Sequence, residues 1–428
     1  MSNAELCSRK NKTGQISDHT MDEQQSNHDW DVVIVGAGPV GGHTANLLVK
    51  KGHRVLLLEE HNEIGRPFQC AGLVTPNAMK QVGLYETILE EVDGALIHGP
   101  SGTLVPVGTG GTVRTYVVCR KLFDEAVVKQ SMESGATLWL NAKPKDAVIK
   151  EDRVELTLIR DGEELEISTK LLIGCDGAHS WKRRHFKMGR PKELMVGFQT
   201  EVVGYQYRKR WLEMYSGSEI APGFFAWVIP SGNDSCRIGL WSTADRLEGR
   251  SIEECYSNLL NHPLWKHRFS GIRETARYCG PVPSGMVKKA YKDRVILIGD
   301  AAGMAKPTTG GGIGPGFEQI NGIVDGLSIA INENKLTENS LKQIARPHFE
   351  KMRKEQSRAR ALRNLLVSDC EDDELDRHFE QFAKPEVVEL INAIGDIEKP
   401  VPLGMALLKK VPAFRKLALR AGMKMIFS

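Results

Sequence analysis

The chain has few of the features that mark membrane-spanning, zinc-binding or nucleic-acid-binding proteins. No apolar run reaches the ~18 residues of a membrane span, and the N-terminus lacks a signal-type apolar core. The eight cysteines are scattered singly without a C-x-x-C pair, which argues against a zinc site and a disulfide framework. A net charge of +3 over 428 residues is too small to indicate nucleic-acid binding. These absences favour a cytoplasmic globular protein without a metal.

Length and composition predict more than one domain. The chain is 41% hydrophobic and 26% charged, as is usual for globular proteins, and 428 residues are too many for one core. Residues 1–29 are polar and rich in Ser, Asn, Gln, Asp and Lys. Such a segment buries too little apolar surface to order itself, so we expect a disordered tail.

A glycine-rich turn follows the first strand pattern. Residues 31–35 form a short apolar run typical of a buried parallel strand, and a second such run over 54–58 ends at Glu59. In a dinucleotide site the first glycine permits the turn, the second admits the pyrophosphate and the third lets the helix pack closely. A carboxylate about 20 residues later accepts the ribose hydroxyls. The predicted cofactor-binding residues of this turn are Gly36, Ala37, Gly38, Pro39, Val40 and Gly41.

Two later glycine-bearing turns follow apolar runs in the same way. Asp176 and Gly177 come after a run over 171–173, and Asp300 comes after a run over 294–298. Asp300 suits a ribityl hydroxyl. A glycine-rich stretch then opens a helix expected over 314–332, whose N-terminus carries about half a positive charge and would stabilise an anionic reduced flavin. This stretch contributes Gly311, Gly312 and Ile313. Together the three turns predict one flavin adenine dinucleotide (FAD).

The three motifs resemble those of the para-hydroxybenzoate hydroxylase-type flavoprotein superfamily over about residues 30–345. The resemblance implies that Asp176 holds its turn near the flavin and that Asp300 contacts the ribityl chain. It also implies that Arg120, which opens a helix expected to reach about residue 134, contacts the cofactor.

Two segments resemble archaeal geranylgeranyl reductases more specifically. Residues 63–72 are similar to that family's P-x-x-C-A motif, which implies that Cys70, Ala71 and Gly72 lie beside the flavin ring. Residues 225–230 resemble its aromatic-x-Trp-x-aromatic-Pro segment, which implies that Phe225, Trp227 and Pro230 line a prenyl pocket. Ile229 replaces the usual aromatic residue, and no glutamate separates Ala71 from Gly72; these departures bear on the exact substrate.

The expected fold is α/β. A Rossmann-like FAD-binding domain over 30–190 and 281–345 encloses an antiparallel-sheet substrate domain over 191–280, and a helical region follows over 346–428. Residues 138–159 read as strands of a small antiparallel layer. Apolar residues recur at helical spacing among basic residues over 408–425. Such a helix either docks on its own domain or lies on an anionic bilayer, and both interpretations stay open.

The favoured function is an FAD-dependent reductase that saturates double bonds of geranylgeranyl chains in archaeal-type ether-lipid precursors. Reduced flavin supplies the hydride, and Cys70 either donates the proton or orients a water. The electron donor would be a ferredoxin, a deazaflavin or a nicotinamide. One alternative is a flavin-dependent monooxygenase or halogenase, because residues 225–230 also resemble the halogenase W-x-W-x-I-P motif. Another is a non-catalytic prenyl-binding protein of related fold. Cys70 and Trp227 also fit ordinary core packing.

Overall fold

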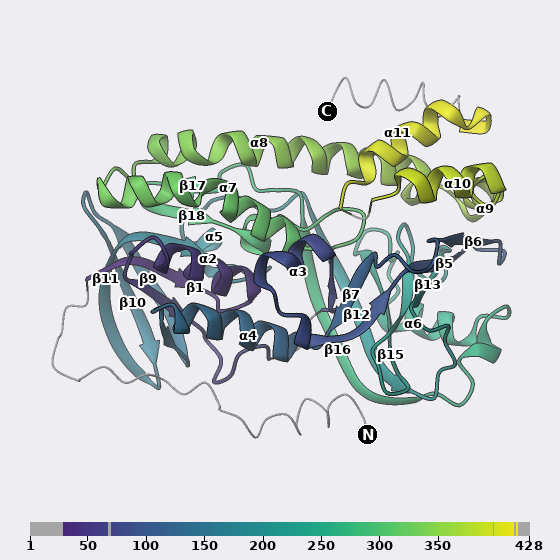
Figure 1. The fold of residues 1–428 in the computed structure, drawn as a ribbon, viewed down its shortest axis with the longest axis horizontal. Coiled ribbons are helices and arrows are strands. Elements are labelled where there is room, and N and C mark those ends of the chain that lie inside the picture. Colours follow the sequence, from purple (N-terminus) through teal and green to yellow (C-terminus); the bar gives the residue numbers. More distant parts are fainter. Residues whose placement is uncertain (1–28, 67–69, 397, 415–416, 418–428) are drawn as a thin grey trace.

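The computed structural model describes residues 29–66, 70–396, 398–414 and 417. Residues 1–28 of the predicted tail and residues 67–69, next to Cys70, lie outside the described residues, whereas Asp29, the last residue of that tail, begins β1. Figure 1 shows an elongated arrangement, with a nucleotide-binding sheet at one end, a second sheet at the other and a long helix along one side of both.

The nucleotide-binding sheet has eight strands, six of them in the order β17-β18-β11-β1-β2-β8. Its bounds are β1 (Asp29–Val35), β2 (Val55–Leu58), β8 (Thr137–Trp139), β9 (Ala142–Ile149), β10 (Val154–Arg160), β11 (Glu163–Gly174), β17 (Tyr291–Lys292) and β18 (Val295–Leu297). β1 pairs in parallel with β2 and β11, and β11 pairs in parallel with β18. β1 and β2 are almost wholly buried, as expected of parallel strands covered on both faces.

One strand of this sheet differs from expectation. β8 was expected in the small antiparallel layer, but it pairs in parallel with β2 at the sheet edge. Of the strands expected in that layer, β9 and β10 pair antiparallel with each other, and β10 pairs antiparallel with β11. The sequence-based assignment is therefore wrong for β8, because a three-residue strand has no pattern that shows which neighbour it will pair with.

Helices cover the nucleotide-binding sheet. α2 (Pro39–Val49) contacts both α4 (Arg120–Glu133) and α7 (Ile313–Asn332). α7 in turn packs against α8 (Glu338–Arg363), which is the long helix in Figure 1. α2, α4 and α7 were expected at about these positions, but the expected boundary at residue 345 between the FAD-binding domain and the helical region falls inside α8.

The second large sheet, called the substrate sheet because it forms most of the predicted substrate domain, has seven strands in the order β16-β12-β15-β14-β13-β5-β6. Its bounds are β5 (Gly94–His98), β6 (Leu104–Val107), β12 (Glu193–Val203), β13 (Trp211–Tyr215), β14 (Ala226–Pro230), β15 (Ser235–Thr243) and β16 (Arg273–Ser284). β5 and β6 come from outside residues 191–280, and β5 pairs in parallel with β13. The expected insertion lacked these two strands. They cover hydrogen-bonding groups that would otherwise be exposed at the edge of β13.

A three-stranded sheet and several short helices connect these parts. The sheet has the order β3-β7-β4, with β3 (Leu73–Val74), β4 (Ile88–Val92) and β7 (Thr115–Val118). The short helices are α3 (Pro76–Val82), η2 (Tyr85–Thr87), α5 (Trp181–His185), α6 (Ile252–Asn261), η3 (Lys266–Arg268) and η4 (Gly299–Ala302). β3 begins directly after Gly72, so this sheet sets the position of the Cys70 segment (residues 70–72).

The C-terminal region is helical, and the described part of it is docked on the protein. After α8 come the π-helical turn η5 (Asn364–Ser368), α9 (Asp372–Phe382), α10 (Pro385–Ile394), α11 (Pro400–Lys410) and η6 (Pro412–Phe414). Four apolar positions of the amphipathic pattern pack into one buried cluster with α8, α9 and α10: Leu408, Val411, Phe414 and Leu417. Residues 418–425 of that pattern lie outside the described residues, so bilayer contact there stays a prediction.

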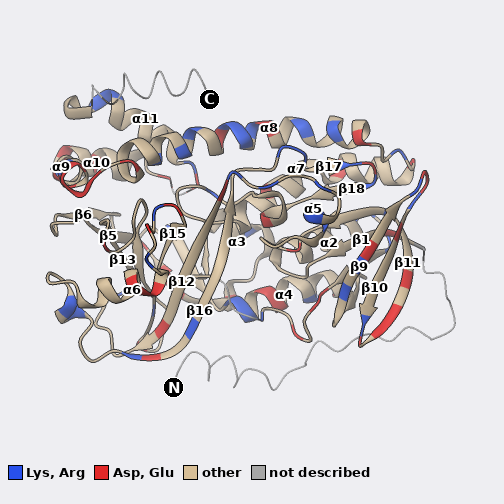
Figure 2. Ribbon diagram, turned by 180° about the vertical axis from the view of Figure 1, so that it is seen from behind, with Lys and Arg blue, Asp and Glu red and all other residues tan. Residues whose placement is uncertain are grey.

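Charge is distributed by element. Lys and Arg follow one another along α8, whereas Asp and Glu gather at the start of α9 and in β11 (Figure 2). Within the described part of the chain, none of the helices combines the length and apolar character needed to cross a bilayer.

Candidate active site

Four predicted cofactor residues follow neighbouring parallel strands. Gly36 comes after β1, Glu59 after β2, Asp176 after β11 and Asp300 after β18. Because the carboxyl ends of parallel strands meet at one edge of a sheet, these residues lie side by side although they span much of the sequence. The structure therefore brings the three glycine turns to one place.

The first glycine turn is built for close approach. Gly36 has φ +100°, and a Cβ there would lie 2.4 Å from the Cys175 carbonyl oxygen. A Cβ at Gly41 would lie 1.9 Å from the Gly36 carbonyl oxygen, so the helix can only start this close to the strand with glycine there. A Cβ at Gly38, by contrast, would meet no described atom within 4 Å. α2 also begins without a side-chain cap. The open space and the free N–H groups at its start fit a pyrophosphate.

Glu59 is held at the edge of this turn by Ala37 and His61. Its Oε2 accepts the Ala37 N–H at 3.0 Å, and its Oε1 lies 2.6 Å from His61 Nδ1. The hydrogen bond to Glu59 raises the pKa of His61, against the opposing effect of burial. Because Oε1 also accepts the His61 backbone N–H at 3.1 Å, Oε2 is the oxygen that keeps a second lone pair for a ribose hydroxyl. Sequence reasoning did not identify His61, since a histidine two residues after the acid belongs to no motif.

The carboxylate of Asp300 shows most clearly where a cofactor hydroxyl would bind. It lies in η4, and its Oδ1 is buried without a hydrogen-bond partner among the described residues. Burial raises the pKa of Asp300 to about 6, although the charge of Arg120 acts in the opposite direction. A Cβ at Gly312 would lie 2.5 Å from this oxygen, so glycine leaves the oxygen uncovered. A buried acceptor normally has a donor, and a ribityl hydroxyl would supply it.

Side chains of α8 hold the loop between η4 and α7 in place. Gln356 on α8 donates to the carbonyl oxygens of Gly303 and Ala305, both at 3.0 Å. Arg363, near the end of α8, donates to the Pro307 carbonyl oxygen at 2.8 Å. α7 then begins at Ile313 without a side-chain cap. No side chain therefore occupies the N–H groups at its start, and their predicted role toward the flavin stays a prediction.

Arg120 lies close to both Cys70 and Asp300. Its Nε and Nη2 donate to the Asp124 carboxylate at 2.9 and 2.8 Å. Burial would lower the pKa of Arg120, but the negative charges of Asp124 and of a Cys70 thiolate outweigh it and raise that pKa. Arg120 also lowers the pKa of Asp300 through its charge. The Cys70 sulfur, a half-buried free thiol, accepts the Gly72 N–H at 3.4 Å. Cys70 and Arg120 thus share a site with the Asp300 turn.

Asp176 has a visible structural role. Its Oδ2 accepts the Trp181 N–H at 2.7 Å and lies 3.4 Å from the fully buried Nζ of Lys182. Burial lowers the pKa of Lys182 and raises the pKa of Cys175 to about 12. The other Asp176 oxygen, Oδ1, is buried without a partner among the described residues. Asp176 therefore holds α5 in place and retains one free acceptor atom at the strand edge.

The substrate sheet turns an aromatic face toward the Cys70 segment. The Trp227 and Trp241 ring centroids lie 5.4 Å apart, and Phe225 lies 5.3 Å from Trp241. Ala71 and Leu73 pack against the same cluster. Trp241 also contacts the loop between η4 and α7, because a Cβ at Gly310 would lie 1.8 Å from its ring. Sequence reasoning singled out Trp227 and Phe225 but not Trp241.

Pro230 is placed differently from the other predicted substrate residues. Side chains alternate along β14, so Pro230 shares a face with Ala226 and Val228, which pack in the cluster against α6. Trp227 and Ile229 point to the opposite face. The structure does not bring Pro230 together with Trp227, and Pro230 is therefore not counted among the residues of the aromatic face.

Two features of the C-terminal region lie apart from this site. Ligand atoms of Cys370, Glu374 and His378 lie within 4.8 Å of one another, a grouping that the sequence-based expectation of no metal did not foresee. His378 Nδ1, however, lies 2.9 Å from the Leu366 carbonyl oxygen, and burial raises the pKa of the Cys370 thiol to about 12. Both observations fit a contact that closes the C-terminal end of η5.

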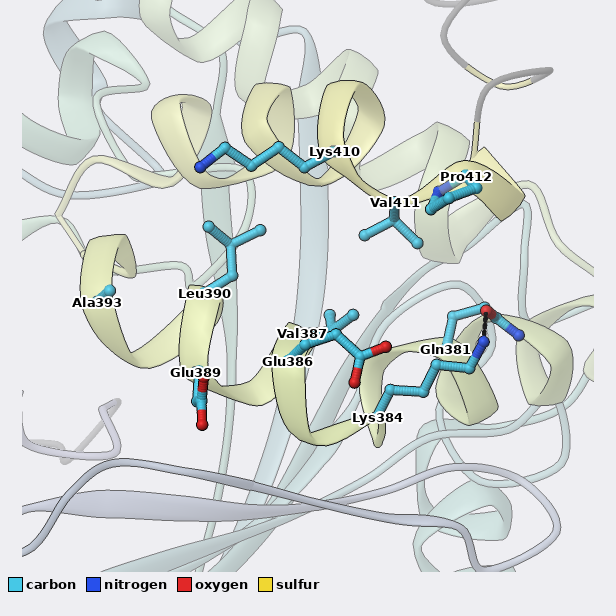
Figure 3. A pocket seen from close by; sticks show the side chains of 10 residues that line it. All are labelled: Gln381, Lys384, Glu386, Val387, Glu389, Leu390, Ala393, Lys410, Val411 and Pro412. Carbon is cyan, nitrogen blue, oxygen red and sulfur yellow. Dashed lines mark hydrogen bonds between the residues drawn. The ribbon is translucent and has the colours of Figure 1, made fainter.

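The second feature is a pocket between α9, α10 and α11 (Figure 3). It shares no residue with the strand-edge site, and charges of both signs surround it. Its lining residues are Gln381, Lys384, Glu386, Val387, Glu389, Leu390, Ala393, Lys410, Val411 and Pro412. It is therefore not the site of flavin chemistry.

Comparison with known proteins agrees with this geometry. The FAD binding domain family matches residues 29–334. The digeranylgeranylglycerophospholipid reductase of Methanocaldococcus jannaschii is 30% identical over 363 residues, covering 82% of this chain and 90% of the reductase.

Solved structures share the fold. A geranylgeranyl bacteriochlorophyll reductase-like protein from Thermoplasma acidophilum superposes with a TM-score of 0.81 at 22% identity, covering 92% of this chain and all of that one. The flavin-dependent halogenase CmlS superposes with a TM-score of 0.68 at 17% identity, covering 92% of this chain and 78% of the halogenase.

Proposed function

Because the chain belongs to the digeranylgeranylglycerophospholipid reductase family and to the wider family of FAD-binding-domain proteins, we propose that it uses FAD to saturate C=C bonds of geranylgeranyl chains in archaeal-type ether lipids. The observation that carries the proposal is the meeting of two surfaces. The strand-edge site for FAD, with the unpartnered Asp300 Oδ1, adjoins an aromatic face through Cys70 and Trp241.

The residues divide into those that hold the cofactor and those that hold the substrate. The glycine turn at Gly36–Gly41 and the start of α2 would receive the pyrophosphate, Glu59 the ribose and Asp300 the ribityl chain. The start of α7, at Gly311, Gly312 and Ile313, would face the flavin ring and favour its anionic reduced form. Phe225, Trp227 and Trp241 offer an apolar wall to an isoprenoid chain.

When bound at this site, reduced FAD would supply the hydride that one carbon of the double bond needs. The other carbon then needs a proton, and the Cys70 thiol would provide it. The positive charge of Arg120 and the Gly72 N–H would stabilise the thiolate that is left, before solvent returns a proton to it. Each turnover would also require two electrons from an external donor; a ferredoxin, a deazaflavin and a nicotinamide are the candidates.

The proposal is tested by anaerobic turnover. Enzyme pre-reduced with dithionite and supplied with a geranylgeranyl glycerophospholipid should yield lipid whose mass has increased by two hydrogens per bond reduced. Dithionite with lipid but no enzyme is the control. A strict requirement for oxygen would indicate the monooxygenase or halogenase alternative instead. Purified protein that neither contains nor takes up FAD would indicate the non-catalytic prenyl-binding alternative.

The proton role of Cys70 gives a second prediction. Cys70→Ala should slow turnover by about 100-fold, the usual range for loss of a general acid, while FAD stays bound. The rate is followed by the anaerobic reoxidation of reduced flavin on adding lipid. Cys279→Ala is the matched control, because Cys279 is a free, exposed thiol on β16. Unchanged turnover in Cys70→Ala would remove the proton role from Cys70.

A further inference from the structure

The face of the substrate sheet that meets the Cys70 segment carries one arginine among its aromatic residues. Arg237, Gly239 and Trp241 alternate along β15 and therefore project to the same face. The Arg237 side chain is only 5% exposed. A charged group buried to this degree is costly unless its donors are used, so its contacts show what it is there to hold.

Arg237 binds two segments that do not belong to its own sheet. Its Nη1 donates to the Ala71 carbonyl oxygen at 2.7 Å and to the Val118 carbonyl oxygen at 3.1 Å. Ala71 follows Cys70 directly, and Val118 ends β7 two residues before Arg120. One guanidinium nitrogen thus holds both the segment that carries the thiol and the strand that leads to its cationic neighbour.

The charge of Arg237 is balanced within the substrate sheet. Its Nε donates to Glu201 Oε1 at 3.1 Å, and Glu201 is its direct cross-strand neighbour on β12. Because the ion pair and both carbonyl contacts use a rigid planar fork, the guanidinium orientation is set from both sides. Lysine at this position would keep the charge but not the fork.

Gly72 is shaped around this contact. It has φ +80°, and a Cβ there would lie 2.2 Å from Arg237 Nη1. The N–H of Gly72 points to the Cys70 sulfur, and its carbonyl oxygen accepts from the Val118 N–H at 2.8 Å. Glycine therefore lets the arginine come close to the same turn that fixes the thiol.

We propose that Arg237 is a positioning residue, which ties the substrate sheet to the Cys70 segment and fixes the Cys70 sulfur against the flavin site. The inference rests on the proposed function, in that Cys70 is taken to serve alkene reduction. Arg237 acts through the Ala71 and Val118 carbonyl oxygens, and the structure shows no contact of its own with Cys70. If the Cys70 thiol were displaced, its chemistry would be unchanged, but it would no longer be placed to protonate the substrate carbon.

The test compares Arg237→Gln, Arg237→Lys and Glu201→Gln in the FAD-loaded full-length protein. Two quantities are measured: anaerobic reduction of the geranylgeranyl lipid, and the rate at which iodoacetamide alkylates Cys70, read by peptide mass spectrometry. The exposed Cys279 in the same sample is the internal reference. Arg277→Gln is the matched control, since Arg277 on β16 makes an exposed ion pair with Glu274.

For Arg237→Gln we expect turnover to fall at least about 10-fold at nearly unchanged KM, as displacement of a reacting group produces. Cys70 alkylation relative to Cys279 should change by about 3-fold or more, because accessibility and charge around the thiol both change. Arg237→Lys should recover part of the turnover, and Glu201→Gln should have a smaller effect of the same sign. Arg277→Gln should stay within about twofold of wild type in both measurements.

Turnover and relative Cys70 alkylation both within about twofold of wild type in Arg237→Gln would overturn the inference. If Arg237→Gln does not fold, the same two criteria are applied to Arg237→Lys and decide the question. If the wild type reduces no alkene, the proposed function fails. The Cys70 alkylation ratio then decides alone whether Arg237 positions the segment.

Discussion

The two large sheets place their functional side chains in different ways. In the nucleotide-binding sheet the candidate residues follow the ends of parallel strands, as Gly36, Glu59 and Asp300 do. In the substrate sheet they project from the faces of antiparallel strands, as Trp227 and Arg237 do. A strand end is a local feature with a recurring glycine pattern, whereas a strand face acquires its role only when another part of the chain packs on it.

This difference explains how far the sequence could predict the site. The Gly36–Gly41 turn, Glu59 and Asp300 were identified because strand, turn and acid lie close together in sequence. Trp241, Gln356 and Arg363 were missed. All three contact the loop from Gly303 to Gly310. No sequence pattern around Gln356 or Arg363 predicts a contact with that loop.

The fold shows the same limit. α2 and α7 were predicted because a glycine-rich turn comes directly before each helix. β5 and β6 were not assigned to the substrate sheet, since the parallel pairing of β5 with β13 joins residues more than a hundred positions apart. Pairing across such a distance leaves no local sign in either strand.

The largest expected effect is a difference in stability between alanine variants of two glycines in the first turn. Gly36→Ala should destabilise the protein by more than about 2 kcal/mol and abolish FAD binding, because its Cβ would collide with the Cys175 backbone at an unfavourable φ. Gly38→Ala should leave the stability of the FAD-free protein nearly unchanged, because its Cβ meets no described atom within 4 Å. It should nevertheless weaken FAD binding.

Urea unfolding and FAD titration of both variants measure these effects. Equal loss of stability in Gly36→Ala and Gly38→Ala would contradict the view that Gly38 faces the cofactor and Gly36 faces the protein.

Asp300→Asn tests the strand-edge site through its pH dependence. The folded-state pKa of Asp300 is raised to about 6 from 3.8, so the cost of burying its charge is absent below the unfolded-state pKa and is complete above about pH 6. The FAD-free wild type should therefore lose about 3 kcal/mol of stability from this group as pH rises from about 4 to 7.

The FAD-free Asp300→Asn variant should not show this loss, and it should bind FAD less tightly because a neutral amide is a weaker acceptor for a ribityl hydroxyl. Denaturant unfolding of both FAD-free proteins across that pH range makes the comparison. Parallel stability curves for wild type and Asp300→Asn would show that Asp300 does not titrate as its burial requires.

The smallest expected effect belongs to the aromatic face. Trp227→Leu should raise the KM for the lipid by about 10-fold and change kcat less, because an apolar wall contributes binding that is alike in the ground and transition states. Trp265→Leu is the matched control, since Trp265 is equally buried but packs in the cluster on the opposite face of the sheet. Steady-state kinetics with the same lipid compares them, and equal KM values in the two variants would place the substrate elsewhere.

A crystal structure of the protein with bound FAD tests the central claim most directly. The account predicts the pyrophosphate at the start of α2, a ribityl hydroxyl donating to Asp300 Oδ1 and the flavin ring between the start of α7 and Cys70. FAD bound with Asp300 Oδ1 still unpartnered, or with its ring away from Cys70 and the aromatic face, would contradict it.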